Sequence, residues 1–525
     1  MKKSKIRKII FVLFIQFNLA FVHAQTIDVL HYKYFLELND ENDRIAGTAE
    51  VRIQFLQPLT EFSLDLVQVK ANGKGMKVES VTGNGAQFQQ VNDKLKIILK
   101  TAGKTKQSQT FTISYNGIPE DGLIISKNKY GDRTFFADNW PNRGRNWIPC
   151  NDVPNDKASV EFIVTAPLHY QIISNGIQVE ETSVSKNKKL THWKEVIPIP
   201  TKVMVIGAAK FAIGRVDSSS CVPVTAWVYP QDKEKGYYDY TLATGILNFF
   251  SDYIGPYPFQ KLANVQSKTI FGGMENASAI FYSEKSVTGN RSSEDLIAHE
   301  IAHQWFGNMA TEKNFSHLWL SEGFATYMTD IYIENKYGKD SSSKRLQKER
   351  QQVIQFAKRS LKAVVDTTSD FMELLNANSY QKGAWVLHML RNEVGDSVFR
   401  KIIRIYYLQY KGSNADTRDF EAVAEKVSGK ELTPFFNQWL YQPGVPKLSV
   451  KWRADGNKIK ATVIQTGEKL FRFPLQFAIT TADGKTTMQK VLINEKETEL
   501  KLDTNLKPVK IILDPNVSLL FEEVK

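Results

Sequence analysis

Cysteine is almost absent from this chain, since only Cys150 and Cys221 occur among its 525 residues. So few cysteines in so long a chain exclude a disulfide framework as the basis of the fold. An exported protein could still pair the two, and the sequence leaves their state open. The remaining composition is that of an ordinary globular protein, with 42% hydrophobic and 24% charged residues. At about 150 residues per domain, the length predicts three or four domains.

Clusters of arginine are also missing, although the formal net charge is +12. Five basic residues lie at the N-terminus and account for part of this charge, leaving +7 on the rest: Lys2, Lys3, Lys5, Arg7 and Lys8. The remaining excess is spread through the chain without interleaved aromatic residues, which is typical of a solvated basic surface. We therefore expect no nucleic-acid partner.

Long apolar runs are absent apart from one near the N-terminus, from Ile9 to Val22. Basic residues precede this run, and a small-residue cleavage site follows it at Val22-His23-Ala24. The alternative is a retained membrane anchor, but Gln16 and Asn18 interrupt the run and it is shorter than the roughly 20 residues that a spanning helix needs. We predict that residues 1–24 are a signal peptide. The mature protein is then exported, periplasmic or secreted, without a stable membrane span.

Residues 25–212 show the pattern of β-strands. Apolar residues alternate with polar ones or form short runs rich in β-branched and aromatic residues, as in VLHYKYFLEL at 29–38 and GTAEVRIQFL at 47–56. Turn residues such as Asn72-Gly73 punctuate them. We predict one N-terminal β domain over this range, a large sandwich or curved sheet.

Residues 213–442 are predicted to be mostly helical, because the apolar period changes from two to 3.6 beyond Gly214. One β-like segment interrupts the pattern at 268–284. The predicted helices besides those of the motif below are 236–255, 341–359, 380–395, 399–410, 417–429 and 432–442. The proline- and glycine-rich segment 443–448 then suits a linker, and β patterning returns for a C-terminal domain over 443–525.

The segment DLIAHEIAHQWFGNMATEKNFSHLWLSEGFAT at 295–326 carries the strongest chemical signal. Positions four apart share one face of a helix, so His299 and His303 can offer two imidazole nitrogens to one metal ion. Glu300 then lies at the edge of that site, where it can contact water without binding the metal. Glu322, on a second predicted helix, completes a set of three ligands. Two His and one Glu leave a fourth tetrahedral position open, which is typical of catalytic zinc.

The alternative interpretation of this segment is an amphipathic helix with two packed histidines. The chain has only eight histidines, so this spacing around a glutamate is improbable by chance. A glutamate on a second apolar helix makes chance more improbable still.

Four motifs in order resemble the M1 zinc aminopeptidases of the gluzincin group. They are PCNDVP at 149–154 with Lys157-Ala158, FGGMEN at 271–276, HEIAHQWFGN at 299–308 with WLSEGFA at 319–325, and YQKGA at 380–384. The resemblance implies a multidomain α+β fold: an N-terminal β saddle, a thermolysin-like, mostly helical catalytic domain and a C-terminal β-sandwich. It suggests a bacterial-type member that lacks the large C-terminal helical domain of many relatives.

The resemblance also implies an activity, the hydrolysis of the N-terminal residue from peptides with a free N-terminus. One zinc ion per chain would be held by His299, His303 and Glu322, and Glu300 would act as general base. Tyr380 would stabilise the oxyanion, although by itself it reads as a tyrosine packed on the core. Substrate would contact Gly272, Gly273, Met274 and Glu275, where Glu275 would pair with the substrate ammonium.

The chain departs from the family near Trp140. Many members place a Glu or Gln for the substrate amine about 12 residues before the Asp of the PCxD segment, and here that count from Asp152 reaches Trp140. Either Asp138 or Asn139 takes this role, or Glu275 acts alone. A carboxylate is also expected to orient a zinc-bound histidine, and Asp330 is a candidate.

Two rival functions stay open. One family branch also hydrolyses a lipid epoxide, and a non-catalytic peptide-binding member is the other alternative. The pocket for the first side chain is assembled from scattered positions, so the sequence predicts no preferred N-terminal residue.

Overall fold

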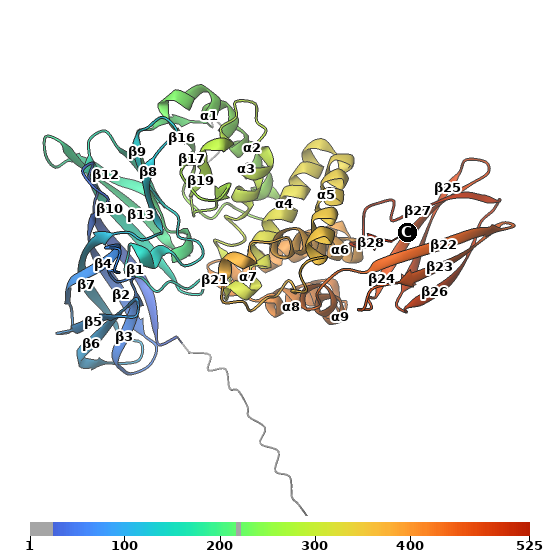
Figure 1. Cartoon of the computed structure of the whole chain (residues 1–525), viewed down its shortest axis with the longest axis horizontal. Helices are drawn as coiled ribbons and strands as arrows, with labels where there is room; N and C mark the ends of the chain where they lie inside the picture. Colours follow the sequence, from blue (N-terminus) through green and yellow to red (C-terminus); the bar gives the residue numbers. More distant parts are fainter. Residues whose placement is uncertain (1–24, 217–221, 525) are drawn as a thin grey trace, which may run out of the picture.

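The computed structural model describes residues 25–216 and 222–524, so the predicted signal peptide and Cys221 lie outside the described residues. The chain runs from β-sheets at one end of an elongated molecule, through a mixed middle part, to further β-sheets at the other end (Figure 1). Among the described residues, Cys150 is buried and forms no disulfide. None of the helices in the described ranges has the length and apolar character needed to cross a membrane.

The N-terminal β region confirms the alternating pattern. Every second residue of Tyr32–Leu36 is buried in β1, because successive side chains of a strand point to opposite faces. The largest sheet has the order β12-β13-β10-β1-β2-β7-β4. Its strands are β1 (Ile27–Glu37), β2 (Ile45–Phe55), β4 (Gly75–Thr82), β7 (Ser108–Ile118), β10 (Lys157–Pro167), β12 (Ile177–Ser183) and β13 (Lys188–Pro200).

Two smaller sheets complete this region. One contains β3 (Leu59–Asp65), β6 (Lys94–Gly103) and β5 (Gln87–Val91). The other has the order β11-β14-β9-β8, with β8 (Leu123–Lys127), β9 (Arg133–Ala137), β11 (Gln171–Ser174) and β14 (Ile206–Ala209). The end of β9 matters for function, because the chain leaves it toward the middle part of the molecule.

A five-stranded sheet opens the middle part, where the sequence predicted helices and one β-like segment. Its order is β15-β16-β17-β19-β18, with β15 (Ala212–Arg215), β16 (Val224–Val228), β17 (Leu262–Ser267), β18 (Gly273–Met274) and β19 (Ala279–Ser283). All six residues of β17 are buried, but Asn264, Gln266 and Ser267 are polar, so this parallel strand lacks the continuous apolar run that would reveal it. The predicted helix 236–255 is also two helices, α1 (Lys233–Tyr240) and α2 (Leu242–Tyr253).

The helices that follow pack around α4, which is buried from Trp319 to Ile333. They are α3 (Glu294–Ala302), α4 (Trp319–Tyr337), α5 (Lys339–Ala357), α6 (Gly383–Val394), α7 (Asp396–Tyr410), α8 (Thr417–Ser428) and α9 (Thr433–Phe436). Short π-helical turns precede α6 at Asn378–Lys382 and follow α9 at Asn437–Tyr441. The strands β20 (Ala310–Glu312) and β21 (Ser413–Ala415) pair beside them.

The C-terminal region consists of two sheets. One has the order β26-β23-β22-β28, with β22 (Lys447–Asp455), β23 (Lys458–Gln465), β26 (Glu497–Asp503) and β28 (Glu522–Glu523). The other has the order β25-β24-β27, with β24 (Phe473–Thr481), β25 (Thr486–Ile493) and β27 (Pro508–Leu513). The segment that precedes β22 is held by the buried side chain of Lys382. Its Nζ donates to the carbonyl oxygens of Gln442 and Gly444 at 3.2 and 2.9 Å.

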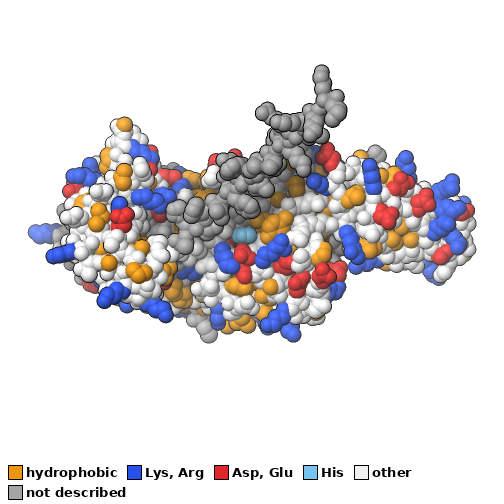
Figure 2. Space-filling model, turned by 90° about the horizontal axis from the view of Figure 1, so that it is seen from below, with side chains coloured by type: hydrophobic (Ala, Val, Ile, Leu, Met, Phe, Trp, Pro, Cys, Tyr) orange, Lys and Arg blue, Asp and Glu red, His pale blue; other side chains and the backbone are white. Residues whose placement is uncertain are grey.

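Basic and acidic side chains are interspersed over the face of the molecule shown in Figure 2. Both signs of charge occur over the helical middle part and over the C-terminal sheets. On this face the charge is therefore mixed, as the spread of basic residues along the sequence indicates.

Candidate active site

Three potential metal ligands converge between α3 and α4. His299 lies in the last turn of α3, His303 follows directly as the C-terminal cap in helical conformation, and Glu322 lies in the first turn of α4. The Nε2 atoms of His299 and His303 are 3.0 Å apart, and each is 3.2 Å from Oε2 of Glu322. The predicted two-histidine face and the return of a second helix beside it are both present.

This donor set fits a zinc ion. Ligand atoms placed tetrahedrally at about 2.1 Å from zinc lie about 3.4 Å from one another, close to the separations observed here. The charges of the site favour a cation as well. Burial lowers the pKa of His303, but the carboxylates of Glu322, Glu275 and Glu300 raise it more strongly, to about 10.

His303 is oriented by groups that the sequence did not reveal. Its Nδ1 lies 3.1 Å from the carbonyl oxygen of Phe306 and 3.1 Å from Oγ of Ser321. A proton on Nδ1 donates to that carbonyl and leaves Nε2 free as a ligand atom. Gly307 permits this contact, because a Cβ there would lie 2.3 Å from Oγ of Ser321.

Asp330, the expected orienting carboxylate, does not contact either histidine in the described structure. It is buried on α4 and accepts a hydrogen bond from Nε of Arg345 at 2.8 Å. Arg345 belongs to α5 and also pairs with Glu349. The turn of α4 therefore directs Asp330 toward α5, and this candidate does not orient a histidine in the described structure.

Glu300 lies on α3 against the edge strand β18. A Cβ at Gly273 would lie 2.4 Å from Oε1 of Glu300, so the missing side chain of Gly273 makes room for the carboxylate. Burial raises the pKa of Glu300 well above its ordinary value. A carboxyl with a raised pKa can accept and release a proton near neutral pH.

Two buried amides tie the α3 segment to the residue after β18. Gln304 Nε2 and Asn308 Nδ2 donate to the carbonyl oxygen of Glu275 at 2.8 and 2.7 Å. Gln304 also accepts from the backbone nitrogen of Ser278 at 2.9 Å. Sequence reasoning missed both amides, although polar residues within a buried motif are a signal, because such groups need partners.

The carboxyl group of Glu275 is buried beside the potential metal ligands. Its Oε1 has no hydrogen-bond partner among the described residues. Burial raises the pKa of Glu275, and the nearby carboxylate of Glu322 contributes to the rise. A buried carboxyl without a partner is costly unless a ligand supplies one.

Tyr380 lies in the π-helical turn before α6 and stacks on His299, with ring centroids 5.9 Å apart and an interplanar angle of 15°. Two glycines bring this segment close to α4. A Cβ at Gly323 would lie 2.9 Å from Cα of Gly383. This close crossing of the two segments therefore places Tyr380 beside the potential metal ligands. π-helical turns are also frequent at functional sites.

The three potential metal ligands line one cavity of about 390 Å³ together with Glu300, Glu275 and Tyr380. One end, here the metal end, holds the three potential ligands with Glu300 and Tyr380. The other, here the amine end, is formed by Glu275 and five apolar side chains. The residues that line the whole cavity are Trp140, Phe271, Gly272, Gly273, Met274, Glu275, Leu296, His299, Glu300, His303, Glu322, Leu375 and Tyr380. Every predicted site residue therefore lies in the cavity lining.

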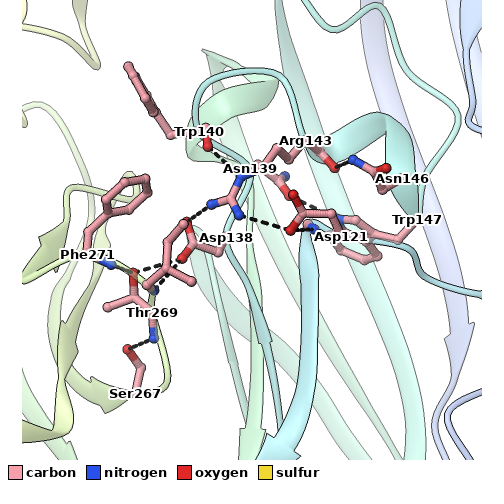
Figure 3. Close-up of polar contacts among 12 residues, drawn as sticks. Asp121, Asp138, Asn139, Trp140, Arg143, Asn146, Trp147, Ser267, Thr269 and Phe271 are labelled. Atoms are coloured by element: carbon pink, nitrogen blue, oxygen red, sulfur yellow. Dashed lines mark hydrogen bonds and ion pairs between the residues drawn. The ribbon is translucent and has the colours of Figure 1, made fainter. Parts of the chain in front are cut away.

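Asp138 and Asn139 are both occupied by structural contacts (Figure 3). Asp138 accepts from Arg143, from Thr269 Oγ1 at 2.9 Å and from the backbone nitrogen of Ile270 at 3.0 Å. The Asn139 side chain donates to two backbone carbonyls and accepts from Trp147 Nε1 at 2.9 Å. Neither residue lines the cavity, whereas Trp140, the next residue along the chain, does.

A metal-ligand set that opens onto a cavity with two further buried carboxyl groups is the arrangement found in metallohydrolases. The chain belongs to peptidase family M1: the Peptidase family M1 domain matches residues 238–439, and the Peptidase M1 N-terminal domain matches residues 29–203.

Several curated relatives are named aminopeptidases. "Probable aminopeptidase 2" of Sulfurisphaera tokodaii is 26% identical over 522 residues, covering 93% of this chain and 63% of the relative. "Leucyl aminopeptidase" of Saccharolobus solfataricus is 24% identical, covering 92% of this chain and 62% of the relative. "Glutamyl aminopeptidase" of Rattus norvegicus is 28% identical, covering 60% of this chain and 35% of the relative. The chain thus spans between about one third and two thirds of the length of these relatives.

Proposed function

We propose that this protein is a zinc-dependent aminopeptidase that removes the first residue from peptides with a free N-terminus. The observation that carries this proposal is the unpartnered Oε1 of the buried Glu275 carboxyl group, in the same cavity as the potential metal ligands. A substrate α-ammonium would supply the missing partner through a charge-assisted hydrogen bond. That contact fixes the cut one residue from the N-terminus.

His299, His303 and Glu322 would hold one zinc ion per chain. The bound ion would supply Lewis-acid chemistry, lowering the pKa of a water molecule to about 7 and polarising the scissile carbonyl. The Phe306 carbonyl and Ser321 keep the His303 ring in the orientation that presents Nε2.

Glu300 moves the protons of the reaction. Its carboxylate takes a proton from the attacking water and later delivers that proton to the leaving nitrogen. Close contact with Gly273 holds the carboxylate beside the strand on which substrate lies. Tyr380 donates its phenol hydrogen to the oxyanion that forms at the former carbonyl oxygen.

Substrate backbone lies along the free edge of β18. Within the described ranges this strand is the last of its sheet and pairs only with β19, so its outer edge can bind an extended peptide. Gly272 and Gly273 leave space for that backbone, and Met274 lines the cavity.

The rest of the peptide leaves on the other side of His299 and Tyr380. A second cavity of about 250 Å³ borders the same two rings there. Its lining from α4, α5 and the π-helical turn is largely polar and includes Thr326, Gln352 and Gln381. This largely polar lining suits a peptide chain of mixed sequence.

We further infer the domain limits and the location of the protein. Residues 213–442 form a thermolysin-like catalytic domain between an N-terminal β saddle at 25–212 and a C-terminal β-sandwich at 443–525. The protein is exported to the periplasm or beyond after removal of residues 1–24, and it keeps no stable membrane span.

Hydrolysis of aminoacyl p-nitroanilides, compared with their N-acetylated forms, tests the proposal. We expect cleavage of the free-amine substrates only, loss of activity with a chelator and recovery with added zinc. Equal rates on acetylated substrates would contradict the role of Glu275. Activity that survives chelation would contradict the role of zinc, and hydrolysis of an epoxide alone would favour the rival enzyme.

A further inference from the structure

Two aromatic rings close the amine end of the cavity, and they come from different parts of the chain. Trp140 follows β9 of the N-terminal region, and Phe271 lies between β17 and β18. Their ring centroids are 5.9 Å apart, with the planes at 85°. Phe315 supports Trp140 from behind, with centroids 5.9 Å apart and planes at 77°. We call Trp140 and Phe271 the aromatic wall.

A buried ion pair fixes both rings of the wall (Figure 3). Arg143 pairs with Asp138 at 2.7 Å, donates to the carbonyl oxygen of Trp140 at 2.7 Å and lies 5.6 Å from the centroid of Phe271. Asp138 also binds the backbone nitrogen of Ile270, directly before Phe271. Both rings are therefore held by the same two charges, which makes the wall a built surface.

The wall meets the first side chain of a bound peptide. If Glu275 holds the ammonium and the scissile carbonyl lies at the metal end, the first Cα lies between them. The cavity lining not used by this chemistry is apolar: Trp140, Phe271, Leu296 and Leu375, with Met274 beside them. A charged first side chain would lose its hydration there without gaining a charged partner, since the wall offers only the neutral, unpartnered Nε1–H of Trp140.

We infer that the aromatic wall selects peptides whose first residue has a large apolar side chain, such as leucine, methionine or phenylalanine, and discriminates against acidic and basic ones. This inference rests on the proposed aminopeptidase function and adds the substrate class. Trp140 is its central residue, because its ring contacts Phe271 and Phe315 and is almost fully buried, at 2% exposure.

The test compares the kcat and KM of the purified chain, loaded with zinc, for the p-nitroanilides of leucine, phenylalanine, alanine, glutamate and lysine. We expect the parent protein to favour leucine over glutamate and lysine at least about 100-fold in kcat/KM. Trp140→Ala should lower the leucine-to-alanine ratio at least about 10-fold, mainly through KM, because contact with the larger side chain is lost. Trp140→Phe should have a smaller effect, and Trp452→Ala, at an exposed tryptophan of β22, none.

Three results would overturn the inference. The first is a parent enzyme that cleaves the glutamate or lysine substrate as well as the leucine substrate. The second is an unchanged leucine-to-alanine ratio in a Trp140→Ala protein that melts like the parent. If that variant does not fold, Trp140→Phe and Phe271→Leu decide the matter by the same ratio. The third is a parent that cleaves no aminoacyl substrate at all, which overturns the proposed function together with the inference.

Discussion

The two ends of the cavity are built in different ways. The metal end takes its ligands from α3 and α4, so the helical repeat places His299 and His303, and a single return of the chain brings Glu322 beside them. The amine end joins the loop after β9 to the loop before β18 through Asp138 and Ile270, which are 132 residues apart in the sequence. Local geometry therefore fixes the metal end, whereas long-range polar contacts fix the amine end.

Glu300→Gln should cause the largest loss at the metal end. The amide cannot take a proton from water, so kcat should fall about 10²–10⁴-fold. Bound zinc, measured by atomic absorption, should stay at one ion per chain, because Glu300 is not a ligand in the proposal. Glu294→Gln, the same change at the start of α3 where the carboxylate binds Lys336, is the control and should keep kcat within a few-fold of the parent. Loss of zinc in Glu300→Gln would make Glu300 a ligand instead.

Gly273→Ala tests the contact that joins the two ends. The new Cβ would lie 2.4 Å from Oε1 of Glu300, so either the carboxylate or β18 must shift. A displacement of about 1 Å can cost about 10²-fold in rate, and we expect a loss of that order in kcat/KM. Gly245→Ala, in α2 and away from the cavity, is the control, because its Cβ would meet nothing within 4 Å. Equal effects of the two alanines would refute the contact.

The metal end was predictable from the sequence because the spacing of the two histidines alone places them on one face of a helix. An i, i+4 pair of histidines needs only a helix to converge, and α3 with its C-terminal cap provides one. The alternating strands of the N-terminal region were predictable for the same local reason. The parallel strand β17 was not, because three of its six buried residues, Asn264, Gln266 and Ser267, are polar and break the apolar run typical of a buried strand.

The amine end was beyond the sequence because its contacts are long-range. Nothing local shows that Asp138 binds Thr269 and Ile270 and is therefore unable to bind a substrate amine. The orienting group of His303 was missed for a related reason. The group is the backbone carbonyl of Phe306, and because every residue has a backbone carbonyl, the amino-acid types do not indicate this contact.

Ser321→Ala should weaken the metal end without touching a ligand. Removing the hydroxyl takes away one of two contacts to Nδ1 of His303, while the Phe306 carbonyl keeps the other. Loss of such a supporting contact lowers metal affinity about 10–100-fold, and we expect the lower end of this range. Competition with a zinc chelator measures it. Ser342→Ala, at a buried serine of α5, is the control, and a parent-like affinity in Ser321→Ala would show that the carbonyl alone orients the ring.

Asp138→Asn should have the smallest effect on rate and act at the amine end. The substitution removes the negative charge that faces Arg143. The amide has only one oxygen, so it cannot accept hydrogen bonds at the positions of both carboxylate oxygens. Leaving buried partners unsatisfied costs about 1–3 kcal/mol, so the free energy of unfolding should fall by this amount in urea titrations. KM for leucine p-nitroanilide should rise a few-fold as the wall loosens, with kcat and zinc content close to the parent's. Asp121→Asn removes the other, half-exposed carboxylate bound to Arg143 and should change stability by less than about 1 kcal/mol. If Asp138→Asn lowered kcat rather than raising KM, the ion pair would serve the metal end as well, and the division between the two ends would fail.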